Sequence, residues 1–188
     1  MHLKDPFESK ILGNNLYVNL LYLCDLPFER NWELIYRASQ DGFKADNFHL
    51  KCDGKSPTLT ILKATTTRFI FGGFTERTWD GYEIQKSDPN AFIFSLINGD
   101  NKEYKMKPNE IENSIFCSPY CGPSFGTGEI HIENNSNILN EFNSFSDLGD
   151  VYQHPIYKYG TEDAKSFLAG THNFQLDEIE IYLMEPKF

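Results

Sequence analysis

Cysteine and tryptophan are scarce in this chain, and long apolar segments are missing from it. Four cysteines, Cys24, Cys52, Cys117 and Cys121, occur among 188 residues, together with two tryptophans. Their irregular spacing is unlike that of a small secreted disulfide scaffold. No apolar run approaches the ~20 residues that span a bilayer, and residues 1–6 hold no apolar h-region, so we expect no signal peptide. These shortages predict a reducing, cytoplasmic compartment.

Basic residues are also few. The sequence has 17 Lys and Arg against 27 Asp and Glu, which gives a formal net charge of −10. Affinity for nucleic acid and for anionic membranes comes from clustered Lys and Arg, so neither is expected as a partner. A basic protein surface would instead be attracted. With 16 Phe and 10 Tyr, the chain has enough apolar area for one core, and its length fits a single domain over residues 1–188.

The first part of the chain has helical periodicity. Leucines recur at helical spacing and predict an N-terminal helix over about residues 12–24. Asn31 as N-cap and Gly42 as C-terminal glycine delimit a second helix. Residues 45–52 are predicted to form a third, short helix.

From Pro57 onward the residues are typical of antiparallel strands. Runs rich in β-branched and aromatic residues predict strands at residues 58–64, 68–75, 91–97, 102–106, 111–117, 129–133 and 178–183. In the last run Ile179, Ile181 and Leu183 alternate with polar residues, which predicts a half-exposed strand. The polar residues 134–150 are interpreted as a long surface loop.

The order of these elements predicts the fold class. Helices come first and hairpins follow, which favours an α+β fold in which antiparallel sheets pack on each other and short helices flank them. The core is expected over about residues 26–184.

Neither glycine-rich segment resembles a phosphate-binding loop. Such a loop needs a lysine followed by Ser or Thr, and residues 71–74 and 122–128 contain no lysine. The glycines are therefore predicted to serve bends and bulges, where a Cβ would clash. Cys117 and Cys121 are not joined by the second close pair that a structural zinc site needs. We expect no metal and no cofactor.

A nucleophile would need a histidine within hydrogen-bond reach. Cys52 and Ser124 are the residues considered for this role, and the five histidines of the chain are spread along it. Sequence alone does not decide whether the fold brings any of them together, and no Gly-x-Ser-x-Gly motif is present. We therefore expect no catalytic residue.

Two charged segments are candidate partner-binding surfaces. Glu76, Arg77, Trp79 and Asp80 follow a predicted buried strand and combine both charges with one Trp, a composition found at interface hot spots. The alternative is that Trp79 fills the edge of the core.

The second candidate surface is acidic. It comprises Glu129 and the segment of residues 143–150, which contributes Asp147 and Asp150. Long polar segments in compact domains are often functional.

An ordered series of short motifs resembles the TLDc domain family. In chain order, the series is LIYRAS (34–39), DGF (41–43), FH (48–49), CDG (52–54), PTL (57–59), FGGFT (71–75) with Trp79, DPNAFIFSL (88–96), GPSFG (122–126), LAG (168–170) with Phe174, and EIEIY (178–182). The motifs cover the chain from about residue 9 to its end. Each motif is weak alone, whereas the ordered series is specific.

The resemblance implies a sandwich of two antiparallel sheets flanked by short helices. It also implies a link to protection against oxidative damage, and for several members binding to the vacuolar-type proton pump. The family carries no settled catalytic mechanism, so no catalytic residue is transferred to this chain. Thr127 interrupts the glycines after the GPSFG motif, and the peptidoglycan-binding, BTB and kelch modules of some relatives are missing from this sequence.

We therefore expect a non-catalytic protein-binding domain linked to oxidative-stress resistance, with subunits of the vacuolar-type proton pump as partners. Such a chain would reach endolysosomal membranes through its partner. One alternative is a thiol-dependent peroxide-handling enzyme, which needs an exposed thiol of low pKa at Cys52 or Cys121. The other is a scaffold or substrate-recruiting module detached from BTB or kelch partners.

Overall fold

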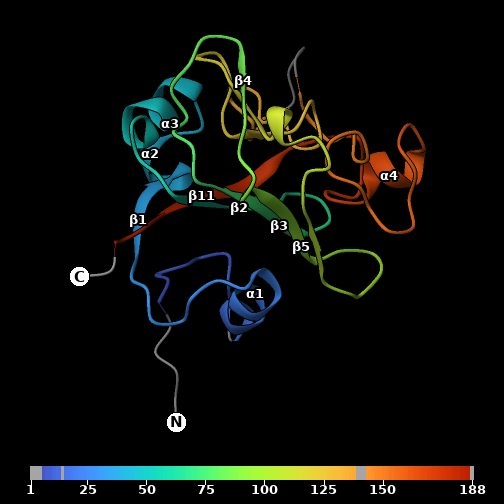
Figure 1. The fold of residues 1–188 in the computed structure, drawn as a ribbon, viewed down its shortest axis with the longest axis horizontal. Helices are drawn as coiled ribbons and strands as arrows, with labels where there is room; N and C mark the ends of the chain where they lie inside the picture. The colour runs from blue at the N-terminus through green and yellow to red at the C-terminus, as the bar shows by residue number, and fades with distance from the viewer. Residues whose placement is uncertain (1–5, 14, 139–142, 187–188) are drawn as a thin grey trace.

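A six-stranded antiparallel sheet runs through the middle of the structure, a computed structural model that describes residues 6–13, 15–138 and 143–186 (Figure 1). Its strand order is β1-β11-β2-β3-β5-β6. The strands are β1 (Trp32–Arg37), β2 (Thr58–Ala64), β3 (Ile70–Thr75), β5 (Phe92–Ile97), β6 (Tyr104–Met106) and β11 (Leu176–Met184). The last strand of the chain thus lies between the first two.

Two smaller sheets form a second layer over one face of the large sheet. They comprise β4 (Ile84–Lys86), β7 (Ile115–Cys117) and β8 (Ser124–Phe125) in one sheet, and β9 (Ser144–Phe145) and β10 (Asn173–Phe174) in the other. Leu62 and Phe71 of the large sheet share one core with Ile115 and Phe125 of the second layer. The predicted α+β fold with packed antiparallel sheets is confirmed, and its second layer is divided in two.

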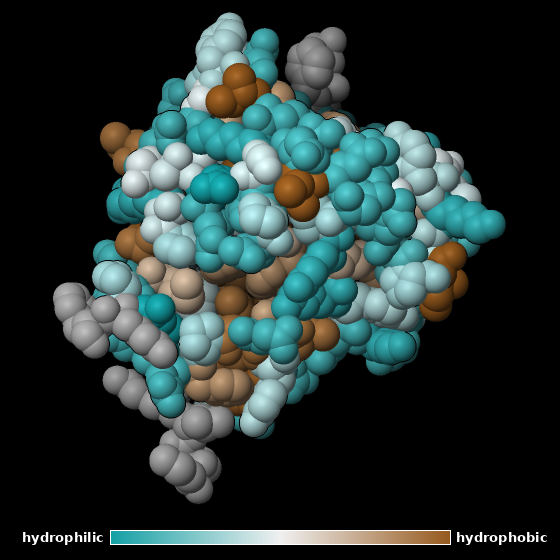
Figure 2. Space-filling model, viewed as in Figure 1, coloured by the Kyte–Doolittle hydropathy of each residue, from teal (hydrophilic) through white to brown (hydrophobic). Residues whose placement is uncertain are grey.

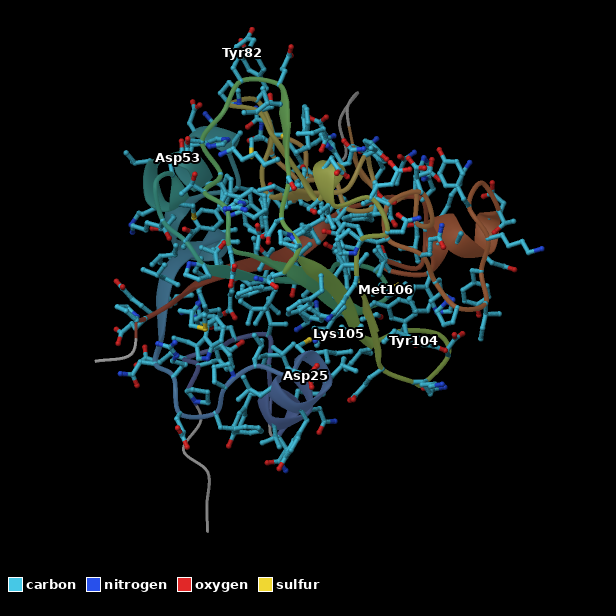
Figure 3. All side chains as sticks on the ribbon, in the orientation of Figure 1. Asp25, Asp53, Tyr82, Tyr104, Lys105 and Met106 are labelled. Atoms are coloured by element: carbon cyan, nitrogen blue, oxygen red, sulfur yellow. The ribbon has the colours of Figure 1, made fainter. Side chains whose placement is uncertain are left out.

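The N-terminal segment covers the opposite face of the large sheet. Helix α1 (Leu16–Cys24) lies against β5 and β6, and a second core forms between this segment and the sheet (Figure 1). Lys105 of β6 donates from Nζ to the carbonyl of Cys24 at 2.7 Å and to the carboxylate of Asp25 at 2.8 Å (Figure 3). A cation at this end of a helix stabilises it. The predicted N-terminal helix is confirmed, although it begins at Leu16.

The remaining helices are short. They are α2 (Ala38–Asp41), α3 (Ala45–Cys52), α4 (Glu162–Ser166) and the 3-10 turn η1 (Ile111–Asn113). Helix α3 has the predicted bounds, whereas α4 lies late in the chain, where no helix is predicted. Among the described residues, no helix has the length and apolar character needed to cross a membrane.

The helix predicted from Asn31 to Gly42 is wrong over most of its length, because strand β1 occupies residues 32–37. A bulge interrupts the pairing of β1 with β11 between Leu34 and Tyr36. A bulge places an extra residue in one strand and breaks the alternation of its side chains. Consecutive residues at the end of β1 are therefore buried, which imitates the spacing of a helix.

Three other segments differ from their predictions. Residues 111–117 divide into η1 and β7, and residues 129–133 form isolated bridges rather than a strand. The segment 134–150 is not wholly a surface loop, since it contains β9 and the buried Leu148. Residues 139–142 of that segment lie outside the described residues.

Strand β11 is buried on both faces, not half exposed as predicted. Ile179 and Ile181 belong to the core under the second layer, as expected, with Leu183 packed against it. The polar positions between them are also buried, and Glu180 has an exposure of 0%. The alternation of polar and apolar residues predicts a solvent-exposed face only when nothing covers that face. In this structure the N-terminal segment covers it.

The carboxylate of Glu180 pairs with a buried arginine. Arg37 Nε donates to Glu180 Oε1 at 2.9 Å, and both side chains are buried. The other acceptor positions of Glu180 receive the Ser9 hydroxyl at 2.6 Å, the Lys10 amide at 2.8 Å and the Tyr182 hydroxyl at 3.0 Å.

The same guanidinium donates to the Glu8 carbonyl. Strands β1 and β11 and the N-terminal segment are thus joined by one buried ion pair. Because every partner is a hydrogen-bonding group, the buried charges are compensated.

We expect Glu180→Gln to lower the free energy of unfolding by about 3–5 kcal/mol, because the substitution leaves Arg37 buried and uncompensated. Urea denaturation would measure the change. Glu33→Gln is the matched control, since Glu33 lies on β1 and is exposed, and it should change stability by no more than about 0.5 kcal/mol. Equal stabilities of the two variants would contradict the role assigned to the buried pair.

Candidate functional site

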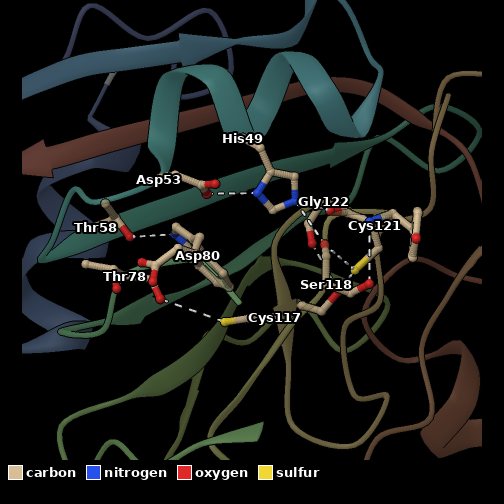
Figure 4. Close-up of polar contacts among 12 residues, drawn as sticks. His49, Asp53, Thr58, Thr78, Asp80, Cys117, Ser118, Cys121 and Gly122 are labelled. Atoms are coloured by element: carbon tan, nitrogen blue, oxygen red, sulfur yellow. Dashed lines mark hydrogen bonds and ion pairs between the residues drawn. The ribbon is translucent and has the colours of Figure 1, made fainter. Parts of the chain in front are cut away.

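Trp79 lies in the core, with an exposure of 1%. Its indole N–H donates to Thr58 Oγ1 at 3.0 Å (Figure 4), and its ring packs edge-on against Phe48 and Phe125 with centroids 5.7 and 5.4 Å away. Trp79 is therefore not a partner contact, and the alternative that it fills the core is confirmed. The segment before β4 places this side chain in the core. The charged residues on both sides of Trp79 do not indicate that it is buried.

Glycine in the middle of β3 makes room for this aromatic cluster. A Cβ at Gly73 would lie 2.7 Å from the ring of Phe125, closer than side chains approach each other. Gly73 therefore permits close packing between the two layers, whereas bends and bulges were predicted for the glycine-rich segments. Gly126 and Gly128 do serve a turn, with φ of +72° and +142°.

The other three residues of this candidate surface are exposed. Glu76 accepts a bond from Asn90 Nδ2 at 2.8 Å, and Arg77 Nε donates to the Ser87 carbonyl at 2.7 Å. The hydrogen bond from the Thr78 side chain lowers the pKa of Asp80, with a further contribution from the charge of Lys86. Their charges line the outside of the segment that leads from β3 to β4.

An exposed pair of tyrosines, which the sequence reasoning missed, lies next along this segment. Tyr82 and Tyr120 are 63% and 61% exposed, their ring centroids are 5.9 Å apart, and Ile84 beside them is 43% exposed. Tyr82 stands at the outer end of the molecule above β4 and points away from it (Figure 3). We call Tyr82, Ile84 and Tyr120 the tyrosine patch.

The pairing of β4 with β7 brings the two tyrosines together. Ile84 lies opposite Cys117 in this pair, so the residues just before β4 and just after β7 meet. The hydroxyls of Tyr82 and Tyr120 are 3.4 Å apart.

Most of the surface in the view of Figure 2 is hydrophilic. Tyrosines are enriched where one side of a ring is apolar and the other end is wet. No spacing in the sequence indicates that these two would pair.

A histidine on α3 holds the loop that carries Tyr120. His49 Nε2 lies 2.9 Å from the Ser118 carbonyl and 3.0 Å from the Cys121 carbonyl (Figure 4). Carbonyl oxygens only accept, so Nε2 carries a hydrogen. On the opposite side of the ring, Nδ1 lies 2.8 Å from the carboxylate of Asp53. These contacts fix the loop that carries Tyr120 against α3.

The second candidate surface is buried at its centre. Glu129 accepts hydrogen bonds from the amides of Thr127 at 3.0 Å, Tyr152 at 3.0 Å and Val151. Burial raises the pKa of its carboxyl group. Glu129 is therefore not a surface contact as predicted, because it closes the turn after β8 from the inside.

The two aspartates of this candidate surface do lie near that turn. Asp150 is exposed and accepts the hydroxyl of Thr127 at 2.7 Å. Asp147 is half-buried, and its amide donates to the Gly128 carbonyl at 2.9 Å. The fold thus brings the predicted residues together, but leaves only Asp150 open to a partner.

None of the four thiols has the environment of a reactive cysteine. All four side chains are buried. Burial raises the pKa of Cys121 to about 11 and of Cys117 to about 12, and it also raises the pKa of Cys52 and Cys24. The thiolate is the nucleophile, and it forms readily only where the pKa is depressed. The environment required for peroxide chemistry at Cys52 or Cys121 is therefore not found.

Ser124 does have a histidine within reach, which the sequence left open. Its Oγ lies 3.3 Å from His131 Nδ1, and His131 Nε2 lies 3.1 Å from Glu133 Oε1. Ser124 and His131 line a hollow of about 240 Å³ together with Phe116 and Phe145. These three polar residues follow one another within ten positions, so their spacing was a signal in the sequence.

The backbone around Ser124 does not complete a nucleophile's site. An acyl-transfer site needs free amide donors for the oxyanion. The amides of Phe125, Gly126 and Thr127 already donate to the Ile130 carbonyl, the Ser114 carbonyl and Glu129. The Ser124 hydroxyl is itself 3.2 Å from the Gly122 carbonyl. The arrangement ties β8 to residues 130–133, and none of the amides of residues 125–127 is free for a substrate.

The chain was compared with models of known protein families. The TLDc domain model matches residues 6–185. No match was found among curated proteins.

We expect Trp79→Ala to lower the free energy of unfolding by about 3–5 kcal/mol, because it leaves a cavity between the two layers. Denaturation in urea would measure the loss. Tyr159→Ala is the control for an exposed aromatic residue, with 57% exposure, and should be close to wild type. A variant at Trp79 as stable as the control would show that the ring is not part of the core.

Glu129 should make stability depend on pH. The pKa of the Glu129 carboxyl group is raised in the folded protein above the ordinary value of 4.5. The stabilisation that this carboxyl group gives is therefore fully present below pH 4.5 and is lost as pH rises through the folded pKa. The stability advantage of wild type over Glu129→Gln should therefore shrink as pH rises above 4.5. Urea denaturation across this range would test it, and an advantage that grows with pH would contradict it.

Proposed function

Because this chain belongs to the TLDc domain family, which is linked to oxidation resistance, we propose that it acts as a non-catalytic protein-binding domain. The tyrosine patch is the observation that carries this proposal. It would form the centre of the contact surface, and Glu76, Arg77 and Asp80 would form its charged rim. This surface replaces the one predicted around Trp79.

The composition of the patch suits a binding hot spot. Hot spots are enriched in Tyr, Trp and Arg, and the rim around the buried centre of an interface is polar. Tyr82 and Tyr120 expose most of their rings. Asp80 and Glu83 on the same segment are exposed and acidic, so the patch suits a partner that presents apolar groups beside basic ones.

The patch is also held in place before binding. His49 fixes the loop of Tyr120, and Trp79 anchors the segment that leads to Tyr82. Binding costs less when few side chains and loops must be ordered. The two rings in contact with each other lose less freedom than isolated exposed rings would.

The environments of the nucleophiles support a function without catalysis. The thiols are buried with raised pKa values, and the amides after Ser124 are engaged within the fold. The tyrosine patch and its charged rim, in contrast, are exposed.

The proposed partner is the vacuolar-type proton pump. The family resemblance suggests it, and the net charge of −10 favours a basic contact surface on the partner. Binding to a subunit that faces the cytoplasm would place the chain at endolysosomal membranes without any insertion of its own.

The double variant Tyr82→Ala, Tyr120→Ala should weaken binding to purified vacuolar-type proton pump by about 30-fold or more, because truncation of a hot-spot residue costs about 2 kcal/mol or more. Biolayer interferometry with immobilised pump would measure the Kd. Tyr159→Ala is the matched control and should bind as wild type does.

Two results would count against the proposal. Wild-type protein that does not bind the pump at micromolar concentration would remove the proposed partner. Turnover of a small molecule by the purified chain, abolished by a single substitution at Ser124 or at a cysteine, would remove the non-catalytic role.

A further inference from the structure

A hollow of about 270 Å³ lies at the end of the large sheet beside α4. Three segments that are distant in the sequence meet there. These are the turn between β2 and β3, the turn between β5 and β6, and α4 with the residues on both sides of it. Pockets for drug-sized ligands measure about 300–1,000 Å³. This hollow is smaller and suits one long side chain.

Aromatic rings form part of its wall. Phe69, Tyr157 and Phe167 line the hollow. His154 packs behind two of them, with its ring centroid 4.6 Å from Tyr157 and 4.3 Å from Phe167. A planar or cationic group that enters therefore meets ring faces or edges that are already held in place.

His154 keeps this wall rigid and uncharged. Its Nδ1 accepts the amides of Ile156 and Tyr157, both at 3.1 Å. Burial lowers its pKa, so the imidazole is neutral at pH 7. A neutral ring does not repel a cation in the hollow.

The polar part of the wall is acidic. Asp100 and Asp163 line the hollow, and none of its lining residues is Lys, Arg or His. Asp100 accepts the hydroxyl of Tyr157 at 2.7 Å and that of Tyr104 at 3.0 Å. Both phenols donate, so they add no charge and hold the carboxylate in position.

The carboxylates of the hollow have no cation of their own. In the described part of the chain, neither Asp100 nor Asp163 forms an ion pair, although the chain pairs other aspartates with lysine or arginine. The Nζ of Lys102 lies over the ring of Tyr104, 5.4 Å from its centroid. Tyr104 packs against His154 and Phe167.

We propose that this hollow binds an arginine side chain of a basic partner segment. A guanidinium is planar and permanently charged, stacks on aromatic faces and donates to carboxylates through several N–H groups. The hollow offers both kinds of contact at once, since Phe69, Tyr157 and Phe167 lie beside Asp100 and Asp163. The size of the hollow admits the side chain but not a folded domain.

The inference rests on the proposed function, because it assigns a second anchoring point to the same protein-binding domain. The hollow and the tyrosine patch are built from different segments, so each is tested by its own variants. An extended basic segment would reach the hollow while another part of the partner contacts the tyrosine patch.

The test is an NMR titration of the full chain with two probes of nearly the same shape. N-acetyl-arginine methylamide carries the guanidinium, and the citrulline analogue replaces it with a neutral urea. We expect the arginine probe to shift the amide signals of Gly99, Ser166 and Gly170, with a Kd on the order of 1 mM. The citrulline probe should leave these signals nearly unchanged.

Two variants on α4 separate charge in the hollow from charge on the helix. Asp163→Asn removes a carboxylate that lines the hollow, and we expect it to weaken the arginine probe at least 5-fold. Glu162→Gln is the matched control, because Glu162 is the neighbouring exposed carboxylate in the same first turn and does not line the hollow. It should leave the Kd unchanged. Both positions are exposed, so both variants should fold.

Equal shifts from the two probes would overturn the inference, as would an unchanged Kd in Asp163→Asn. Shifts that spread over the surface instead of gathering at the hollow would overturn it too. If the arginine probe does not bind but the pump is captured through the tyrosine patch, this inference alone is wrong. If the probe binds at the hollow and the pump is not captured, the proposed partner alone is wrong.

Discussion

The buried ion pair between Arg37 and Glu180 joins the two ends of the fold. Its carboxylate receives groups from β1, β11 and the segment before α1, so one interaction holds the N-terminal segment on the large sheet. That segment covers the second face of the sheet and creates the second core. Since buried charges are costly unless they are fully compensated, the pair also ties the position of the N-terminal segment to the pairing of the first and last strands. The large sheet can be central because both of its faces are covered in this way.

The surfaces proposed for binding depend on the rigidity of the groups behind them. Trp79 fills the space between the layers and anchors the segment that leads to Tyr82, and His49 holds the loop of Tyr120. At the other surface His154 supports the rings around the arginine hollow. In each case an aromatic or imidazole ring behind the surface is held by at least one hydrogen bond to a backbone or hydroxyl group. The loops outside then present their side chains with little freedom to lose on binding.

Particular segments show what could be predicted. The bounds of α3 and β2 follow from local periodicity, and both are confirmed. The sequence predicts a helix where strand β1 lies, because a bulge opposite β11 buries consecutive residues of the strand. The prediction that β11 is half exposed is also wrong, because the alternation of polar and apolar residues does not reveal that the N-terminal segment covers the polar face. In both cases the deciding partner lies more than a hundred positions away along the chain.

The family, the α+β class and most of the strands can be predicted from the sequence, because ordered motifs and local periodicity are properties of neighbouring residues. Only the tertiary structure decided which candidate residues are accessible. It buried Trp79 and Glu129, left Glu76, Arg77 and Asp80 exposed, and paired Tyr82 with Tyr120. Whether a side chain is exposed depends on what packs over it, and that is set by contacts between segments far apart in the chain.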